Sequence, residues 1–490
     1  MKRIVSYVIK CAFKMSKKMV EKRMKIFDKY LDKGKLVHQQ YQKDGVRWIL
    51  ENEMRREKDT LFGVRGGFIA DEMGLGKTIM LIGTMLANYV PRTLVVVPLA
   101  LMDQWYDQIL RTTGHRAILF HGENKKRVSL DQLETSKVVI TTYGAICVPR
   151  GEKSGCILHT VFWGRVVFDE AHHLRNANTN NYYGASLLNA GIRWLVSGTP
   201  IQNRREDMYN LCRLLRIPYK DPDSRLDILR NFVLRRTKKE VGILLPDVVE
   251  DMNVVSWNNE REKKLAESIH SKLSICRKED KDTDKDKKDK DTADKDKKDE
   301  PNKENVLDFT PLQAMLKARQ CCILPRLVQA NPSVSSSSKL DFVVGEILRN
   351  KGNGSGKLIF CHFREELDEI CKRLTASGLN GVACIDSRTS DVRRKQCLVE
   401  NNEALVLQIQ TGCEGLNLQE HYSEIYFVGP HWNPAIEDQA VARCHRFGQT
   451  RVVYVRRFEM ASFGNQDINI ERYVHNVQES KRIMAQEYFP

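Results

Sequence analysis

The chain has 490 residues, 41% of them hydrophobic and 8% aromatic, which is enough apolar material for globular cores and suggests two to four domains at about 100–200 residues per domain. No apolar run approaches the roughly 20 residues that a membrane-crossing helix needs. Lys10 and Lys14 interrupt the N-terminal apolar patch too early for a secretory signal peptide. We therefore expect neither a membrane protein nor a secreted one. The formal net charge of +16 suits a polyanionic partner, although solubility alone would also account for it.

Short apolar runs rich in β-branched residues alternate with helical stretches along the chain. The first set is LVVVP (94–98), KVVITTY (137–143), RVVFDE (165–170) and RWLVSG (193–198), with candidate helices at 78–90 and 205–216. The second set is KLIFCHF (357–363), GVACID (381–386), ALVLQIQ (404–410), EIYFVG (424–429) and VVYVRRF (452–458). Strands that are apolar throughout and are spaced by helices indicate parallel sheets covered on both faces. We therefore predict an α/β protein with two lobes.

A segment of Lys and Asp separates the two sets. Residues 277–305 hold eleven Lys or Arg and twelve Asp or Glu, so the segment is nearly neutral and offers no apolar face to a core. We interpret it as a disordered insert, and its balanced charge argues against a nucleic-acid-binding tail. The expected divisions are a basic N-terminal extension (1–35), the first lobe (36–250), a helical linker (251–276), the insert (277–305), a linker into the second lobe (306–338) and the second lobe (339–490).

A phosphate-binding loop is predicted at Asp71-Glu72-Met73-Gly74-Leu75-Gly76-Lys77-Thr78, which follows the apolar residues 67–70 and opens a helix. Backbone amides at a helix N-terminus cradle phosphates, the Lys ammonium reaches the β and γ oxygens, and the Thr hydroxyl holds magnesium. Asp71 stands where the general pattern has its first Gly. Because a chance Gly-Lys-Thr is common, this segment alone does not decide the function.

An acidic pair, Asp169 and Glu170, follows the apolar strand 165–168 and precedes Ala171 and His172. Two acids at the carboxyl end of a strand face the phosphates bound by a loop one strand away. Asp169 would hold magnesium through water, and Glu170 would orient or deprotonate the attacking water.

Two arginines in the segment QAVARCHRFGQ (439–449), Arg443 and Arg446, are three residues apart and share one helical face. Arginines that a second lobe brings to a γ-phosphate stabilise the charge of the transition state. Two solvated surface arginines would be the ordinary interpretation, and only the accompanying motifs favour the catalytic one.

Taken together, residues from about Leu36 to Phe458 resemble the Swi/Snf-type DNA translocases of helicase superfamily two. The family-specific signature is FVLRRTKKEV (232–241) followed by Leu245 and Pro246, which general superfamily-two helicases lack. The other matching segments are Tyr41-Gln42 with 45–48, DEMGLGKT (71–78), LVVVPLALMDQW (94–105), VVITTY (138–143), DEAHHLRN (169–176), LVSGTPIQN (195–203), KLIFCHF (357–363), TGCEGLNLQ (411–419), HWNP (431–434) and QAVARCHRFGQ (439–449).

The resemblance implies two RecA-like lobes that share one ATP site and move along double-stranded DNA. It implies that ATP is bound by Gln42, Asp71, Glu72, Met73, Gly74, Leu75, Gly76, Lys77 and Thr78. It makes Lys77, Asp169, Glu170, Arg443 and Arg446 catalytic, with Mg²⁺ held by Thr78 and Asp169. It places Thr141, Thr142, Asn417 and Trp432 near DNA. One departure is Cys413, which replaces the second of the family's paired glycines before Gly415 in the segment that couples the DNA and ATP sites.

Three alternatives compete with this interpretation. An RNA-remodelling DEAH helicase is suggested by residues 169–172, but the LRRTKKEV and WNP segments argue against it. A catalytically silent DNA-binding scaffold is disfavoured because the catalytic residues named above are all present. A RING-bearing repair enzyme is disfavoured because the region between Pro246 and Leu340 lacks zinc-ligand spacing.

Cysteine usage bears on the cellular setting. The thirteen cysteines are scattered, with no C-x-x-C pair, which suits buried free thiols in a reducing compartment and argues against a zinc site. We expect a nuclear location, or a viral DNA compartment if the source is a virus, and protein partners that direct the motor to its targets. The sequence leaves the pathway (remodelling, repair or transcription) open.

Overall fold

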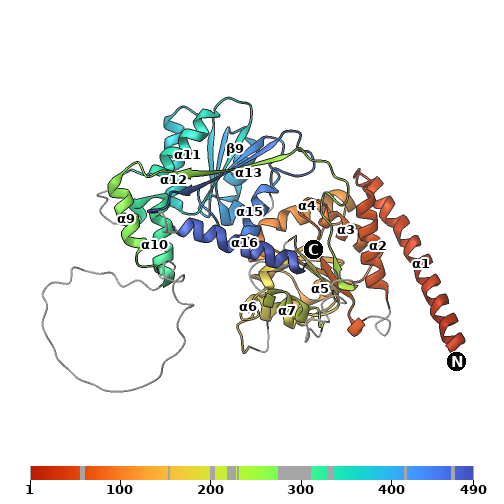
Figure 1. The fold of residues 1–490 in the computed structure, drawn as a ribbon. Helices are drawn as coiled ribbons and strands as arrows, with labels where there is room; N and C mark the ends of the chain where they lie inside the picture. The colour runs from red at the N-terminus through yellow and green to blue at the C-terminus, as the bar shows by residue number, and fades with distance from the viewer. Residues whose placement is uncertain are drawn as a thin grey trace, which may run out of the picture.

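Two lobes, each built on one parallel sheet, make up the protein (Figure 1). The computed structural model describes residues 2–55, 61–152, 155–198, 205–217, 228, 231–273, 311–328, 336–412, 416–464 and 469–488. The charged insert predicted at 277–305 lies outside these residues. Every strand pairing in both sheets is parallel, which confirms the predicted α/β fold class with two RecA-like lobes.

The sheet of the first lobe has the strand order β3-β4-β2-β5-β6-β1-β7. Its strands are β1 (Gly66–Ile69), β2 (Thr93–Val97), β3 (Ile118–Phe120), β4 (Val138–Thr142), β5 (Phe162–Asp169), β6 (Asn189–Val196) and β7 (Val233–Leu234). Its helices are α2 (Gln40–Met54), α3 (Lys77–Ala87), α4 (Met102–Thr113), α5 (Leu130–Thr135), α6 (Asn180–Leu187) and α7 (Arg205–Leu214). Leu94 and Val96 of β2 enter one core while Val95 and Val97 enter the other, because successive side chains of a strand point to opposite faces. Both faces are therefore buried under helices.

The sheet of the second lobe has the order β10-β11-β9-β12-β13-β8. Its strands are β8 (Val248–Val255), β9 (Gly356–Cys361), β10 (Val382–Ile385), β11 (Ala404–Gln408), β12 (Tyr422–Phe427) and β13 (Val453–Met460). Its helices are α9 (Glu260–His270), α10 (Pro311–Ile323), α11 (Ser338–Arg349), α12 (Arg364–Ala376), α13 (Asp391–Val399), α14 (Ile409–Gly412), α15 (Pro434–Val441) and α16 (Ile470–Tyr488). In Figure 1, α16 runs from the second lobe toward the first.

Strand β8 corrects the expected boundary between the lobes. The first lobe was expected to extend to residue 250 and a helical linker to follow, but residues 248–255 pair along their whole length with β13 of the second sheet. Helices α9 and α10, expected in linkers, pack in the core of the second lobe through residues such as Ala266 and Ala318. The connection between the lobes is therefore the segment between β7 and β8.

The N-terminal extension is also more than a basic tail. It forms helix α1 (Lys2–Lys33), and Val20, Met24, Phe27 and Leu31 are buried on one face at the spacing of an amphipathic helix. Phe27 packs so closely on α3 that a β-carbon at Gly83 would collide with its ring. Helix α1 is thus part of the first lobe, and Lys18, Lys22, Lys25 and Lys29 are exposed on it.

A buried carboxylate, Glu53 of α2, joins this helix to the sheet of the first lobe. Arg165 of β5 donates to it from Nε at 2.6 Å and from Nη2 at 2.5 Å. Asn88 donates to the same carboxylate at 2.8 Å and Trp194 at 2.9 Å, and Glu53 and Arg165 are 0% and 1% exposed. Four hydrogen bonds therefore compensate the burial of this charge.

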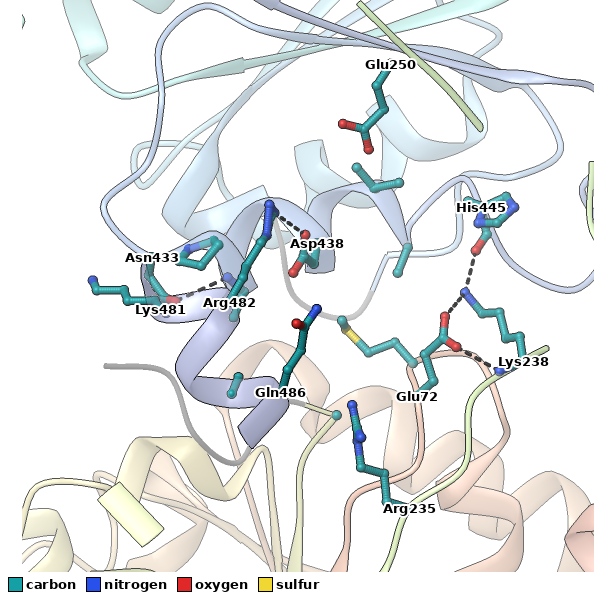
Figure 2. Close-up of a pocket in the computed structure, with 17 residues that line it drawn as sticks. Glu72, Arg235, Lys238, Glu250, Asn433, Asp438, His445, Lys481, Arg482 and Gln486 are labelled. Atoms are coloured by element: carbon teal, nitrogen blue, oxygen red, sulfur yellow. Dashed lines mark hydrogen bonds and ion pairs between the residues drawn. The ribbon is translucent and has the colours of Figure 1, made fainter. Parts of the chain in front are cut away.

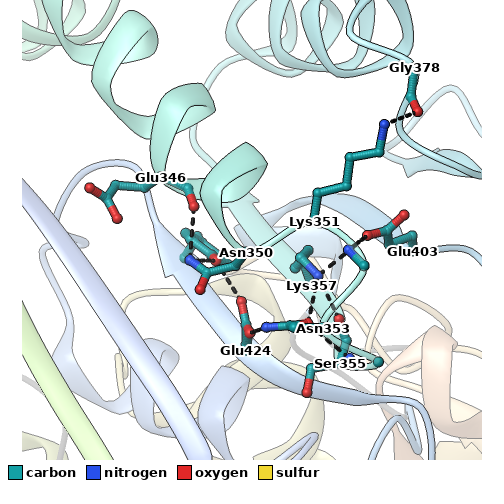
Figure 3. Close-up of polar contacts among 12 residues, drawn as sticks. Glu346, Asn350, Lys351, Asn353, Ser355, Lys357, Gly378, Glu403 and Glu424 are labelled. Atoms are coloured by element: carbon teal, nitrogen blue, oxygen red, sulfur yellow. Dashed lines mark hydrogen bonds and ion pairs between the residues drawn. The ribbon is translucent and has the colours of Figure 1, made fainter.

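A second buried charge, Lys357, lies at the start of β9 (Figure 3). Its Nζ donates to Asn353 Oδ1 at 3.2 Å and to the Ser355 carbonyl at 2.7 Å, and lies 3.6 Å from Glu403. Asn353 in turn donates to Glu424 at 2.5 Å. This network closes the amino-terminal edge of the second sheet, the edge opposite to the strand ends that carry the candidate site.

Glu53→Ala is expected to lower the free energy of unfolding of the first lobe by about 3–5 kcal/mol, because it leaves Arg165 buried without its counter-charge. Urea unfolding followed by tryptophan fluorescence measures this change. The control is Glu123→Ala, which removes an exposed ion pair with Lys126 at 3.0 Å and should cost less than about 1 kcal/mol. Equal effects of the two substitutions would contradict the role assigned to Glu53.

Candidate active site

The predicted phosphate loop links β1 to α3 at the carboxyl edge of the first sheet. Gly76 adopts a left-handed conformation (φ +78°), which favours glycine, and a β-carbon there would collide with the Gln42 amide. Gln42 of α2 is buried, and its Nε2 donates to the Leu75 carbonyl at 3.2 Å. The structure therefore brings Gln42, a predicted ATP-binding residue, against the loop.

Lys77 lies within this loop. Its Nζ donates to the carbonyl of Asp71 at 2.8 Å and to that of Glu72 at 3.3 Å. Burial lowers the pKa of Lys77, while the carboxylates of Glu170, Asp71 and Asp169 oppose that shift. The ammonium group therefore sits between the loop and the acidic pair, where it can exchange backbone carbonyls for phosphate oxygens.

Asp71 has a structural reason to replace the usual glycine. It is 0% exposed, and Arg236 donates to it from Nε at 3.0 Å and from Nη2 at 2.5 Å. Two backbone bonds run beside this pair, from Ala70 to the Leu234 carbonyl at 2.7 Å and from Glu72 to the Arg236 carbonyl at 2.9 Å. The LRRTKKEV segment thus continues the edge of the sheet and holds the phosphate loop in place.

The acidic pair ends β5, two strand positions from β1 in the sheet. Trp105 of α4 donates from Nε1 to Asp169 Oδ2 at 2.7 Å, and the backbone N–H of Glu170 donates to Oδ1 at 3.0 Å. Tyr143 donates to the Asp169 carbonyl at 2.6 Å. Glu170 itself has φ +49° and ψ +51°, a conformation that costs a non-glycine residue free energy and recurs at functional sites.

Trp105 and Tyr143 were not predicted as site residues. Both stand in the segments matched to the family, but only the tertiary structure shows that their polar hydrogens point at Asp169.

The surroundings of the two carboxylates shift their pKa values in opposite directions. Burial raises the pKa of Asp169, and the Glu170 carboxylate raises it further, to about 6. Burial also raises the pKa of Glu170, but His172, Lys77 and Arg443 together outweigh burial and bring it to about 2. Glu170 is therefore ionised at neutral pH, which suits a group that accepts a hydrogen bond from water.

The two predicted arginines reach this site from the second lobe, but they lie in the turns that follow α15 (Pro434–Val441) and not on one helical face as expected. Arg443 is close enough for its charge to lower the pKa of both Lys77 and Glu170. Arg446 places its Cβ 3.6 Å from the position that a β-carbon on Gly74 would occupy. Within the described part of the chain, the buried atom Arg443 Nε makes no hydrogen bond, while Glu170 Oε2 lies 3.3 Å from His172 Nδ1. Unsatisfied polar atoms of this kind are costly unless a ligand completes them.

The predicted DNA-binding residues occupy different surroundings. Thr141 is 0% exposed and donates to the Phe120 carbonyl at 2.8 Å, and Thr142 is buried with its hydroxyl 3.0 Å from His121 Nδ1. The Thr141 side chain therefore does not face solvent, because β4 lies inside the sheet. Thr142 is enclosed in the same way, so a phosphate contact in this segment would fall to other groups.

Asn417 and Trp432 lie on the second lobe. Asn417 is exposed and its Oδ1 accepts a hydrogen bond from Arg446, so this residue joins the coupling segment to an arginine of the site. Trp432 is half-buried, and the guanidinium carbon of Arg319 lies over the Trp432 ring, 5.8 Å from the ring centre. Cys413 and residues 199–203 of the matching segment 195–203 lie outside the described residues.

A cavity of about 440 Å³ lies between the lobes beside the phosphate loop (Figure 2). Glu72, Met73 and Lys238 line it from the first lobe and the connection, while Asp438 and His445 line it from the second. The cavity is thus lined by both lobes and borders the phosphate loop, whereas the predicted catalytic residues Lys77, Asp169, Glu170, Arg443 and Arg446 are not among its lining residues.

Oxygen ligands suitable for magnesium are present at the loop. Thr78 lies in the first turn of α3 beside Lys77, and Asp169 is a carboxylate whose pKa is raised by burial and then by the neighbouring Glu170 carboxylate. Magnesium prefers such oxygen donors and usually keeps several waters. Across the residues that the structure describes, no group of three His, Cys, Asp or Glu side chains is arranged to hold a metal. Those residues likewise include no helix long and apolar enough to cross a membrane.

Comparisons with known proteins point in one direction. The SNF2-related domain model matches residues 41–225 and the helicase conserved C-terminal domain model matches residues 338–448. The "Probable global transactivator" of Orgyia pseudotsugata multicapsid polyhedrosis virus is 27% identical, and the alignment covers 92% of this chain and 91% of that protein. The "DNA repair protein RAD5B" of Arabidopsis thaliana is 24% identical, with coverages of 86% and 45%.

"Chromodomain-helicase-DNA-binding protein 9" of Mus musculus is 27% identical, with coverages of 85% and 15%. The chain therefore spans most of the viral relative and less than half of the other two. Among solved structures, the "Sulfolobus solfataricus SWI2/SNF2 ATPase core in complex with dsDNA" aligns over 92% of both chains, with 22% identity and a TM-score of 0.38.

The raised pKa of Asp169 predicts that Asp169→Asn stabilises the protein. A carboxyl group whose pKa is about 6 in the folded state and near 3.8 in the unfolded state lowers the free energy of unfolding by up to about 3 kcal/mol once the pH exceeds 6. The increase in the free energy of unfolding caused by Asn should therefore be largest at pH 8 and smaller at pH 5, where the folded state already binds the proton. Thermal unfolding at both pH values measures it.

Asp386→Asn serves as the control for this experiment. Burial raises the pKa of Asp386, but hydrogen bonds from Arg388 and its positive charge bring it below the ordinary value. Its stabilising effect is present at any pH above about 4, so the substitution should destabilise the protein equally at pH 5 and pH 8. A stabilisation by Asp169→Asn that does not change with pH would contradict the electrostatic explanation.

Proposed function

Because the chain belongs to the SNF2-related ATPases of the Swi/Snf type, within helicase superfamily two, we propose that it hydrolyses ATP between its lobes to move along double-stranded DNA. The observation that carries this proposal is the meeting of the phosphate loop and the acidic pair of the first lobe with Arg443 of the second. An ATP site divided between two bodies links hydrolysis to their relative movement.

Each group of the site has a role that its position supports. Gln42 and the loop 71–78 bind the nucleotide, with Lys77 leaving the carbonyls of Asp71 and Glu72 to meet the β and γ phosphates. Ionised Glu170 accepts a hydrogen bond from the attacking water and orients it in line with the γ phosphorus. Arg443 and Arg446 stabilise the negative charge that builds up on the transferred phosphoryl group.

Magnesium would be held by the Thr78 hydroxyl and, through water, by Asp169. It would neutralise phosphate charge in the transition state. Asp169 is prepared for this role because Trp105 and the Glu170 backbone fix both of its oxygens. The bound cation would also remove the electrostatic cost that raises the pKa of Asp169 in the free protein.

Closure and reopening of the lobes would advance the protein along the duplex. DNA phosphates are bound without reading sequence, by backbone amides and basic side chains on both lobes. The net charge of +16 and the near neutrality of the insert leave the lobes strongly basic, which suits this contact. We propose that the motor remodels protein–DNA complexes in chromatin, repair or transcription, in the nucleus or a viral DNA compartment, with protein partners choosing the target.

Hydrolysis should depend on duplex DNA and on the named groups. We expect Lys77→Ala and Glu170→Gln to lower the DNA-stimulated rate by at least about 10²-fold, and Arg443→Ala or Arg446→Ala by about 10³-fold with little change in nucleotide affinity. Phosphate release and fluorescent-nucleotide binding provide the two readouts. Arg349→Ala, an exposed arginine of α11, is the control.

The outcomes of this experiment separate the assignments. Wild-type turnover in Lys77→Ala or Glu170→Gln would refute the site. Loss of nucleotide affinity in step with the rate would instead give the arginines a role in binding or folding.

The track should remain double-stranded during translocation. ATP is expected to drive displacement of the third strand of a DNA triplex, whereas an oligonucleotide in a forked duplex should stay annealed, because the proposed motor follows the backbone of intact duplex. Both substrates are tested with one preparation, with Lys77→Ala as the control for ATP dependence. Efficient unwinding of the fork without triplex displacement would make the protein a strand-separating helicase.

A further inference from the structure

Lys238 lies where three parts of the molecule meet (Figure 2). It belongs to the connection between the lobes, after β7, and it is 8% exposed. Its Nζ lies 3.0 Å from Glu72 Oε1 of the phosphate loop and donates at 3.0 Å to the carbonyl of His445 in the second lobe. One ammonium group therefore bridges the phosphate loop and residues 443–446, the arginine segment, which holds Arg443 and Arg446.

The attachment to the phosphate loop is reinforced by the backbone. The Lys238 N–H donates to Glu72 Oε2 at 2.7 Å, so the Glu72 carboxylate accepts from both the backbone and the side chain of the same residue. The Lys238 side chain also passes over Gly74, with its Cε 3.5 Å from the position of a β-carbon there. These contacts fix Lys238 relative to the loop independently of the second lobe.

The attachment to the second lobe falls between the two arginines. His445 is the residue between Cys444 and Arg446, and its carbonyl is the acceptor that Lys238 binds. Its ring Nε2 lies 2.9 Å from the Pro246 carbonyl, so the connection holds this residue at a second point. The orientation of residues 443–446 over the loop is therefore tied to the connection and not only to the packing of the second lobe.

We propose that Lys238 is a positioning residue that holds the arginine segment 443–446 over the phosphate loop, so that closure of the lobes aligns Arg443 and Arg446 with the nucleotide. This inference rests on the proposed function. When the lobes separate, Lys238 keeps Glu72 and loses His445, and when they close it regains a charge-assisted hydrogen bond. Such bonds are roughly twice as strong as neutral ones, and this one is largely shielded from water.

The proposal makes a specific kinetic prediction. Lys238→Met keeps the length and apolar stem of the side chain and the backbone bond to Glu72, and it removes only the ammonium group. With saturating duplex DNA, we expect kcat to fall about 10- to 100-fold while KM for ATP and the affinity for a fluorescent nucleotide change less than about threefold. A residue needed only for folding or for binding ATP would not separate kcat from KM in this way.

Lobe closure supplies a readout that is independent of turnover. Fluorophores attached through unnatural amino acids at the exposed positions Glu123 and Val399, one on each lobe, report the distance between lobes by energy transfer. With duplex DNA and a non-hydrolysable ATP analogue, Lys238→Met should show a smaller closed population than the wild type. Lys238→Arg, which retains the charge and the donors, should recover most of the closed population and of kcat.

The chain offers a matched control in Lys239, which is adjacent, of the same type and exposed. Lys239→Met should match the wild type in kcat, KM and closure. Should Lys238→Met fail to fold, Glu72→Gln carries the test, because it weakens the attachment of Lys238 to the loop and should lower kcat and closure in the same direction.

Different results would overturn the positioning role of Lys238 and the proposed function. Wild-type kcat and closure in Lys238→Met, or a rise in KM with kcat unchanged, would overturn the positioning role while leaving the proposed function intact. A wild-type protein without DNA-stimulated hydrolysis would instead overturn the proposed function on which this inference rests.

Discussion

The buried ion pair between Asp71 and Arg236 is the interaction on which the rest of the site depends. A fully buried carboxylate is tolerable only when its partner has good geometry and its remaining lone pairs are satisfied, and Arg236 meets that condition with two hydrogen bonds. The pair attaches the connection between the lobes to the start of the phosphate loop. The loop therefore takes its shape together with the segment that leads to the second lobe, so nucleotide binding and lobe position share one support.

The charges around the loop contrast with those in the lobe interiors. Glu53 and Lys357 are buried, yet each is surrounded by donors or acceptors that compensate it. At the site, by contrast, Asp169 has a raised pKa, and Arg443 Nε is buried without a hydrogen bond. Sites of this kind are less stable than they could be, because their groups are arranged for a ligand and not for one another. The well-satisfied networks elsewhere maintain the fold that holds the site.

Several contacts join the segments around the catalytic groups to one another and to the second lobe. Trp105 of α4 belongs to the matching segment 94–105, and it donates to Asp169, the predicted magnesium carboxylate. Asn417, predicted near DNA, accepts from Arg446. Asp103, two residues before Trp105, pairs with Lys395 of the second lobe at 3.1 Å. A change in α4 or in the coupling segment would thus act on catalytic groups through direct hydrogen bonds and not through a long chain of contacts.

The sequence by itself determined the features whose physical cause is local. Runs of β-branched residues predicted the strands, and glycine, lysine and threonine at the start of a helix predicted a phosphate loop, because these properties depend on neighbouring residues along the chain. The acids after β5 were predicted as site residues from their position at the end of a strand, and the arginines at 443 and 446 from their spacing and the accompanying motifs. The structure brings the acids and Arg443 together, whereas their chemical roles remain predictions.

Only the tertiary structure decided what depends on distant segments. Residues 248–255 were expected at the end of the first lobe and the start of a helical linker, but their pairing with β13 makes them a strand of the second lobe. Likewise, the burial of Thr141 follows from the position of β4 inside the sheet, and the reason for Asp71 follows from Arg236, 165 residues away along the chain. Strand pairing and buried ion pairs join residues of high sequence separation. Local patterns indicate that a strand or a charge needs a partner, but they do not indicate which partner the fold will supply.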